Sequence, residues 1–311
     1  MSHVFPRHTK AQLPTAVGGD GCYLIDSDGK RYFDGSGGAA VSCLGHSDAD
    51  VIRAVQDQVG KLAFAHTSFL TSDPAEELAD LLIANAPGDL DRVYFVSGGS
   101  EATESAIKLA RQYYLEKGET ERRHVIARRQ SYHGNTLGAL AAGGNEWRRA
   151  QFAPLLINIS HIAPCYEYVD RADGESAFDY GQRVANELEA EILRLGPETV
   201  MAFMAEPVVG ATSGAVPAVK GYFKRIREIC DQYGVLLILD EVMCGMGRTG
   251  HLFACDADGV APYILCLAKC LGAGHHPLGA MRCSKQHIQQ VEAGRGHSQH
   301  RPPPNRQPRP T

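Results

Sequence analysis

Short apolar β-type runs alternate with helical patterns between residues 92 and 280, and this alternation constrains the fold more than any other feature. The strand-like runs are residues 92–96, 124–127, 201–205, 235–239 and 263–267. Helical spacing of apolar residues lies between several of them, for example at residues 223–233. Strands that alternate with helices favour an α/β domain with a mostly parallel sheet covered on both faces. Ligands bind beyond the carboxyl ends of the strands in such sheets, so the residues after each strand are candidates for a site.

Composition narrows the class of protein further. The chain has 311 residues, 44% hydrophobic and 22% charged, which is enough for a core in one large domain or two ordinary ones. A formal net charge of −5 argues against general nucleic-acid binding. No apolar run approaches the ~20 residues of a membrane span, and the N-terminus has no apolar signal core. Nine cysteines without paired spacing favour reduced thiols, so we expect a cytoplasmic protein that binds neither membrane nor nucleic acid.

Local patterns predict three elements before residue 90. The pair Asp28-Gly29 predicts the turn of a small hairpin whose second strand holds residues 31–34. Residues 47–50 predict a capping box, followed by a helix with apolar positions 51, 52, 55, 59 and 62. Residues 73–76, with a proline at the first helical position, predict a second helix with an apolar stripe at positions 78, 81 and 82.

The end of the chain differs in composition from the rest. Residues 294–311 carry four arginines, five prolines and no acidic residue. Such a segment cannot bury enough apolar surface to fold, so we expect it to be disordered. An RNA-binding role would rest on these four arginines alone, and it would be strongly dependent on salt.

The first two predicted strands lead into segments suited to a phosphate and a planar ring. Residues 97–100, Ser-Gly-Gly-Ser, precede a helix, and the paired glycines and the helix start favour a bound phosphate at Gly99 and Ser100. The alternative is a tight turn with Ser100 as a helix cap. After the second strand, Tyr132 can cover the face of a planar cofactor, or it is simply a half-buried loop tyrosine.

The other three strands each lead into a charged residue. The third leads into Glu206, which is a site residue or a solvated loop charge. The fourth leads into Asp240 and Glu241, whose burial requires a cationic partner unless they cap a helix. The fifth delivers Lys269 before a glycine-rich turn, where an apolar setting would make its amine a nucleophile; a surface lysine is the alternative.

Taken together, these strand-end residues form a set that matches one cofactor. A phosphate site, a stacking aromatic, a carboxylate and a lysine are predicted at the same edge of one sheet. Pyridoxal phosphate needs an anion site for its phosphate, a lysine for its aldehyde and an acid that keeps its ring nitrogen protonated. The sequence therefore predicts a pyridoxal-phosphate site, and it predicts no metal site.

From about residue 32 to about residue 292 the chain resembles the class III pyridoxal-phosphate aminotransferases of fold type I. The resemblance is carried by motifs in a specific order: YFDG, LGH, SGGSEATESAIKLAR, SYHGNT, Glu206-Pro207, LLILDEVMCGMGRTG and LAKCLGAGHHPLGA. It implies a three-layer α/β large domain with a mostly parallel sheet and a partial small α+β domain. The implied division is residues 1–60 for the N-terminal part of the small domain, 61–285 for the cofactor-binding large domain and 286–311 for an aberrant, disordered tail.

The resemblance also implies a role for each matching position. Gly99 and Ser100 would hold the cofactor phosphate, and Glu206 would lie behind the site or at the substrate entrance. Lys269 would form the internal aldimine and then shuttle the proton between substrate and cofactor. The remaining implied positions are Tyr132 stacked on the ring with His133 beside it, Asp240 paired with the ring nitrogen, and Val242 packed under the ring.

Three positions near the lysine depart from the family pattern, and the end of the chain departs further. Cys270 stands where glycine is usual, Tyr263 where aspartate is usual, and His275-His276 replaces an aromatic–polar pair, changes that could strain the lysine loop. After residue 294 the family pattern stops, which suggests a frameshift or truncation before the C-terminal small domain is complete.

The sequence supports two functional hypotheses. The first is an aminotransferase that moves an amino group from a donor to a keto acid or aldehyde, acting as a homodimer; decarboxylation, racemisation and aminomutase chemistry use the same scaffold. The second is a catalytically impaired remnant or a pseudoenzyme of the same family that partners a full-length subunit.

Overall fold

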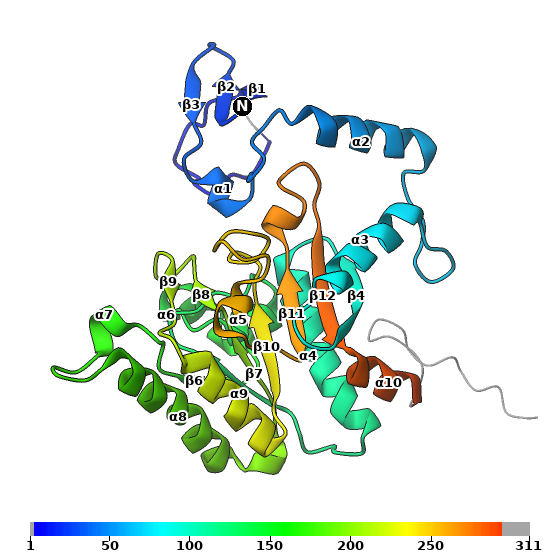
Figure 1. Cartoon of the computed structure of the whole chain (residues 1–311). Helices are drawn as coiled ribbons and strands as arrows, with labels where there is room; N and C mark the ends of the chain where they lie inside the picture. Colours follow the sequence, from blue (N-terminus) through cyan, green and yellow to red (C-terminus); the bar gives the residue numbers. More distant parts are fainter. Residues whose placement is uncertain (1–2, 294–311) are drawn as a thin grey trace, which may run out of the picture. The chain divides into compact units, whose positions relative to one another are not determined.

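The computed structural model describes residues 3–293, which form two compact units (Figure 1). One unit holds the chain up to Phe64 together with Ala273–His276. The other holds Ala65–Gly272 and the described residues from Pro277 to Ala293. The division of the sequence at residues 60 and 285 into domains remains a proposal. Among the described residues no helix is long and apolar enough to cross a membrane.

The first unit contains a three-stranded antiparallel sheet and two helices. The sheet has the order β1-β2-β3, and the predicted hairpin turn at Asp28-Gly29 joins β2 to β3. The predicted capping box is wrong in its cap residue. Asp48 Oδ1, not Ser47, accepts from two backbone amides at the start of α2, while Ser47 Oγ accepts from the Gly21 amide at 2.8 Å. The elements are β1 (Ala16–Asp20), β2 (Tyr23–Asp26), β3 (Arg31–Phe33), α1 (Gly37–Ala40) and α2 (Ala49–Lys61).

The second unit is built on a seven-stranded sheet with the order β4-β12-β11-β10-β7-β5-β6. β12 runs antiparallel to both of its neighbours, so the other six strands are parallel to one another. All five predicted strands are present, with boundaries shifted by at most two residues. The strands are β4 (Leu90–Val96), β5 (His124–Arg128), β6 (Ser160–Ile162), β7 (Val200–Ala205), β10 (Leu236–Asp240), β11 (Ile264–Leu267) and β12 (Gly279–Ser284).

Two strands of the seven-stranded sheet have no clear sequence signal. β6 has only three residues, too few for a pattern. β12 reads Gly-Ala-Met-Arg-Cys-Ser, which is neither an apolar run nor an alternation of apolar and polar residues, yet every residue in it is buried. β12 also inserts between β4 and β11, and such an insertion depends on long-range pairing rather than on local sequence.

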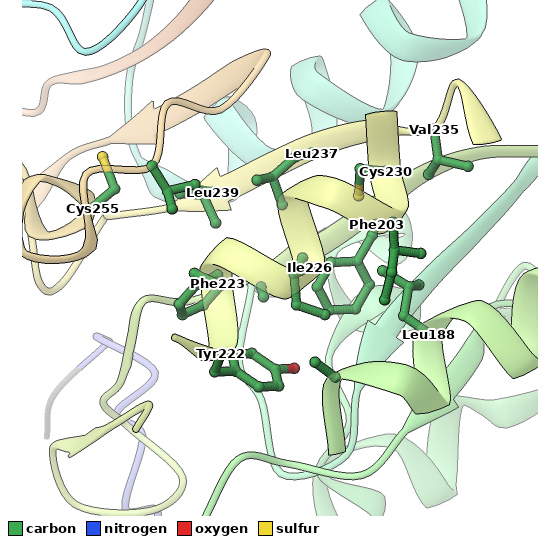
Figure 2. Packing of buried hydrophobic residues seen from close by; sticks show 14 of the residues in the cluster. Leu188, Phe203, Tyr222, Phe223, Ile226, Cys230, Val235, Leu237, Leu239 and Cys255 are labelled. Carbon is green, nitrogen blue, oxygen red and sulfur yellow. The ribbon is translucent and has the colours of Figure 1, made fainter. Parts of the chain in front are cut away.

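Helices cover both faces of the sheet because both faces of its strands are apolar. In β7 alternate side chains enter two separate core clusters: Phe203 and Ala205 join one, and Ala202 and Met204 join the other. α8 (Ala177–Leu195) and α9 (Tyr222–Tyr233) bury residues in the first cluster, and α4 (Gly99–Glu116) and α5 (Leu137–Ala142) in the second. Figure 2 shows α9 residues packed toward Phe203 and the β10 residues. The predicted three-layer α/β architecture is therefore confirmed.

Of the remaining helices of the second unit, α3 (Asp73–Ala84) begins where the sequence predicts and α10 (Lys285–Ala293) was not predicted. α3 (Asp73–Ala84) begins where predicted, and Leu82 is buried, but the predicted stripe is wrong at Leu81, which is 64% exposed. Lys285–Ala293 form α10, so the described part of the predicted disordered tail is helical, and residues 294–311 lie outside the described residues. The short elements are α6 (Glu146–Arg149), α7 (Glu167–Asp170), η1 (Ala150–Leu155), η2 (Pro197–Thr199), η3 (Ala254–Asp258), η4 (Lys269–Leu271), β8 (Val208–Val209) and β9 (Val216–Pro217).

Candidate active site

The predicted site residues lie at one edge of the seven-stranded sheet. The strands β4, β5, β7, β10 and β11 are mutually parallel, so their carboxyl ends lie along the same edge. Each of them leads into one of the predicted segments, and all of these segments belong to the second unit. The topology thus gathers residues that are separated by up to about 170 positions in the sequence.

A buried histidine–carboxylate pair lies at the centre of this edge. His133 Nδ1 is 2.8 Å from Asp240 Oδ2, and the two side chains are 0% and 4% exposed. Asp240 Oδ1 accepts a hydrogen bond from the Val242 amide at 3.0 Å. His133 thus supplies the partner that a buried carboxylate requires. The Nε2 atom of His133 is buried and has no hydrogen-bond partner among the described residues.

The two adjacent acids at the end of β10 have different roles. Glu241 Oε2 and Oε1 accept from the backbone amides of Ala254 and Cys255 at 2.7 and 2.8 Å, at the start of η3. Burial raises the pKa of the Glu241 carboxyl. The helix-cap alternative therefore applies to Glu241, while Asp240 faces the histidine of another strand end.

Glu206 is a buried carboxylate that fixes the loop after β5. Its Oε2 accepts from the Tyr132 amide at 3.1 Å, and its Oε1 accepts from the Gly210 amide at 3.2 Å. Burial raises the pKa of the Glu206 carboxyl; the charge of His133 lowers it and that of Asp240 raises it. At 4% exposure Glu206 is not the solvated loop charge of the alternative interpretation.

Lys269 follows β11 and begins η4 with a left-handed backbone (φ +49°), a conformation that is strained for a residue with a side chain. Burial lowers the pKa of the Lys269 ammonium, while the charges of Asp240 and Glu206 raise it. The alternative interpretation of Lys269 as a surface lysine is therefore wrong. In this loop the positive φ angles of non-glycine residues are at Lys269 and Ala273 and not at Cys270, whose Sγ accepts from Arg248 Nη2 at 3.0 Å.

The start of α4 has the features of an anion site. The N-cap residue of α4 is Gly98, and the helix begins at Gly99. The alternative in which Ser100 caps the helix is therefore wrong. A Cβ added to Gly99 would lie 2.6 Å from Val242 Cγ1, so only glycine permits this close approach of α4 to Val242, two residues after β10. The dipole of this 18-residue helix favours an anion at its N-terminus.

Residues beyond the sequence prediction also contact the site. The Arg148 guanidinium lies 4.9 Å from the centroid of the half-buried Tyr132 ring. Ser100 Oγ donates to Asn135 Oδ1 and accepts from the Asn135 amide, both at 3.1 Å. Asn135 belongs to the SYHGNT motif, so the sequence already indicated that it lies near the site. Arg148 lies on a four-residue helix without a pattern that would have indicated it.

Comparison with known proteins assigns the family. The model of the class III aminotransferases matches residues 5–300. An uncharacterised aminotransferase of Schizosaccharomyces pombe is 47% identical over 279 residues, which cover 89% of this chain and 60% of that protein. An uncharacterised aminotransferase of Bacillus subtilis is 39% identical over 295 residues, covering 95% of this chain and 66% of that protein. The chain therefore belongs to the class III aminotransferase family, as its motifs indicated.

Solved structures agree with this assignment. A thermostable (S)-enantioselective omega-transaminase from Thermomicrobium roseum has a TM-score of 0.89 at 37% identity, covering 94% of this chain and 66% of that chain. The omega-transaminase of Pseudomonas jessenii in complex with PMP has a TM-score of 0.89 at 31% identity, with coverage of 94% and 66%. The chain thus has the transaminase fold, and it spans about 60% of the length of its Schizosaccharomyces pombe relative.

Proposed function

We propose that this protein is a pyridoxal-phosphate-dependent aminotransferase that moves an amino group from a donor to a keto acid or aldehyde. One observation carries the proposal: the buried His133–Asp240 pair, Glu206 and a lysine with a lowered pKa all lie at the sheet edge where α4 begins. The lysine and the carboxylates interact through their charges. Membership of the class III family and the likeness to a transaminase in complex with PMP support it.

The residues present fit this cofactor. Gly99, Ser100 and the start of α4 would hold the phosphate, because the helix dipole and the uncapped turn favour an anion. Asp240 would keep the ring nitrogen protonated, and each of its oxygens has a second lone pair free for another hydrogen bond. Tyr132 would stack on the ring, with Val242 under it. The unpartnered Nε2 of His133 is a polar atom that a bound group would satisfy.

Lys269 is the residue that we assign to catalysis. Pyridoxal phosphate, when bound, supplies the group that accepts electrons from the substrate carbon. A lysine whose pKa is lowered by burial is more often neutral, and a neutral amine is a nucleophile and a base. Lys269 would therefore carry the cofactor and then move a proton. Glu206 and the His133–Asp240 pair would fix the charge around it.

We also propose an oligomeric state for the protein. We infer a homodimer from the family resemblance, and light scattering on the purified chain tests it. A catalytically impaired member of the family is the alternative function, in which the site residues are retained but turnover is absent. The following experiment separates the two.

The test is a visible absorption spectrum of the purified chain with pyridoxal phosphate, recorded before and after borohydride, beside Lys269→Ala. Lys224→Ala is the matched control, because Lys224 is an exposed lysine on α9. We expect a borohydride-reducible band in the wild type and in the Lys224 variant and its loss in the Lys269 variant. A band that persists in Lys269→Ala would contradict the assignment of the lysine.

Turnover is measured next, with an amino donor and a keto acid. Conversion of the bound cofactor by the donor alone, seen as a shift of the band, supports the aminotransferase. A stable band that no donor changes would favour the impaired alternative, and a wild type with no band would overturn the proposed cofactor.

A further inference from the structure

Three side chains on one face of α4 contact the loop between β5 and α5. Ser100, Thr103 and Glu104 stand at positions i, i+3 and i+4, which share a helix face. Ser100 exchanges hydrogen bonds with Asn135, as described above. Thr103 Oγ1 donates to the His133 carbonyl at 2.7 Å. The helix that begins at the predicted phosphate site thus holds the loop that carries the predicted ring-stacking residues.

Among these three side chains, that of Glu104 is ionisable. Its Oε2 accepts from Thr136 Oγ1 at 2.5 Å and from the Ala139 amide at 3.0 Å. Thr136 precedes α5 and makes no side-chain cap of its own, so the carboxylate from α4 takes that place. A Cβ added to Gly138 would lie 2.4 Å from Glu104 Oε1, so a side chain at position 138 would displace the carboxylate from this place. Hydrogen bonds to a charged acceptor are roughly twice as strong as neutral ones.

We propose that Glu104 is a positioning residue of the cofactor site, an inference that rests on the function proposed above. Glu104 fixes the end of the SYHGNT loop to α4, so that Tyr132 and His133 keep a constant spacing from Ser100. A site built from two separate segments loses affinity when their spacing relaxes, because the phosphate and the ring no longer bind in one geometry.

The test compares Glu104→Ala, Glu104→Gln and wild type by titration with pyridoxal phosphate, following the visible band. The matched control is Glu187→Ala on α8. Glu187 is half-buried like Glu104, and its Oε2 accepts from a backbone amide, that of Ala163 at 2.8 Å, after the edge strand β6. Both substitutions remove a carboxylate that joins a helix to a loop, but only one of the two loops carries predicted site residues.

We expect Glu104→Ala to raise the dissociation constant of pyridoxal phosphate about tenfold, which corresponds to ~1.4 kcal/mol. Glu104→Gln should lose clearly less affinity than Glu104→Ala, because its amide oxygen can accept the same two hydrogen bonds, although without the charge. Glu187→Ala should bind as wild type does. Unchanged binding in Glu104→Ala, or an equal loss in Glu187→Ala, would overturn the proposal. If Glu104→Ala does not fold, the same titration is made with Thr136→Val, which removes the hydroxyl that donates to Glu104. We expect this variant to lose about threefold in affinity for pyridoxal phosphate.

Hydrogen exchange of the cofactor-free protein separates this inference from the proposed function. Loss of Glu104 should speed exchange in peptides covering residues 131–142 and leave those covering 160–170 unchanged. If the wild type does not bind pyridoxal phosphate, the proposed function fails and with it the role of Glu104 toward that cofactor. Faster exchange would then still establish the contact that holds the loop, and unchanged exchange would reject that as well.

Discussion

Two buried arginines of the second unit differ in their hydrogen bonds, although both lie over aromatic rings and both leave Nε without a partner among the described residues. Arg128 ends β5, and its Nη2 donates to the Glu206 carbonyl, while its guanidinium lies 5.7 and 5.6 Å from the rings of Tyr222 and Phe223. Arg282 lies in β12, also fully buried, with its guanidinium 4.5 Å from the Phe253 ring. Its three guanidinium nitrogens have no hydrogen-bond partner among the described residues.

The buried ionisable groups of the two regions also differ. At the strand ends, His133, Glu206 and Asp240 each have at least one hydrogen-bond partner. In the region of β12 and α10, burial lowers the pKa of Arg282 to about 10 and that of His287 to about 4. We therefore expect buried charge to be tolerated at the site, where it is paired, and to oppose folding at Arg282, whose guanidinium nitrogens make no hydrogen bond within the described part of the chain. Removing a charge should therefore have opposite effects on stability in the two regions.

The largest effect is expected at the site. Asp240→Ala leaves His133 buried without its carboxylate and removes the acceptor of the Val242 amide. Breaking a buried pair by removing one partner costs about 3–5 kcal/mol. Urea denaturation measures the change, with the surface pair Arg53–Asp50 as control, where Asp50→Ala should change stability little. A loss in Asp240→Ala no larger than in the control would show that the pair contributes no stability.

The second effect is a dependence of stability on pH that comes from His287. Burial lowers its folded pKa to about 4, and the nearby charge of Lys117 acts in the same direction. The unfolded chain binds this proton at a pKa of about 6.5, so folding stability falls as pH drops from about 6.5 toward 4. A shift of that size corresponds to roughly 3 kcal/mol.

The measurement is the midpoint of urea denaturation at pH 7 and pH 5 for wild type and His287→Asn. His287 is packed against Tyr113 and Tyr263, with ring centroids at 4.3 and 5.7 Å, and its Nδ1 is 2.6 Å from Ser284 Oγ. The variant should lose stability at pH 7 and show a smaller decrease on acidification. An equal decrease in both proteins would assign the pH dependence to other groups.

The smallest effect is expected at Arg282 and has the opposite sign from that at Asp240. Replacing a buried guanidinium that lacks hydrogen bonds with methionine should raise the free energy of unfolding by about 1–3 kcal/mol. Arg282→Lys is the control, because it keeps a buried charge and should give no gain. A loss of stability in Arg282→Met would show instead that this charge offsets the buried Glu241, whose negative charge raises the pKa of Arg282.

The alternation of strands and helices was sufficient to predict the architecture and the edge of the sheet that carries the site. Residues 97–100 and 131–136, with Glu206, Asp240 and Lys269, were found because each lies at the end of an apolar strand or within three residues after it. The topology brings these segments to one edge, since parallel strands have their carboxyl ends together. Their roles toward a cofactor remain proposals.

The sequence by itself determined the family, the strands with strong patterns and the candidate residues, because these depend on local spacing and on motifs. The tertiary structure decided how those residues are paired. Asp240 faces a histidine 107 positions away, while the adjacent Glu241 caps η3, and no local pattern distinguishes the two acids. The insertion of β12, the burial of Arg282 and the contact of Glu104 with the loop after β5 likewise depend on long-range packing. Side chains far apart in the chain become neighbours only when the sheet has formed.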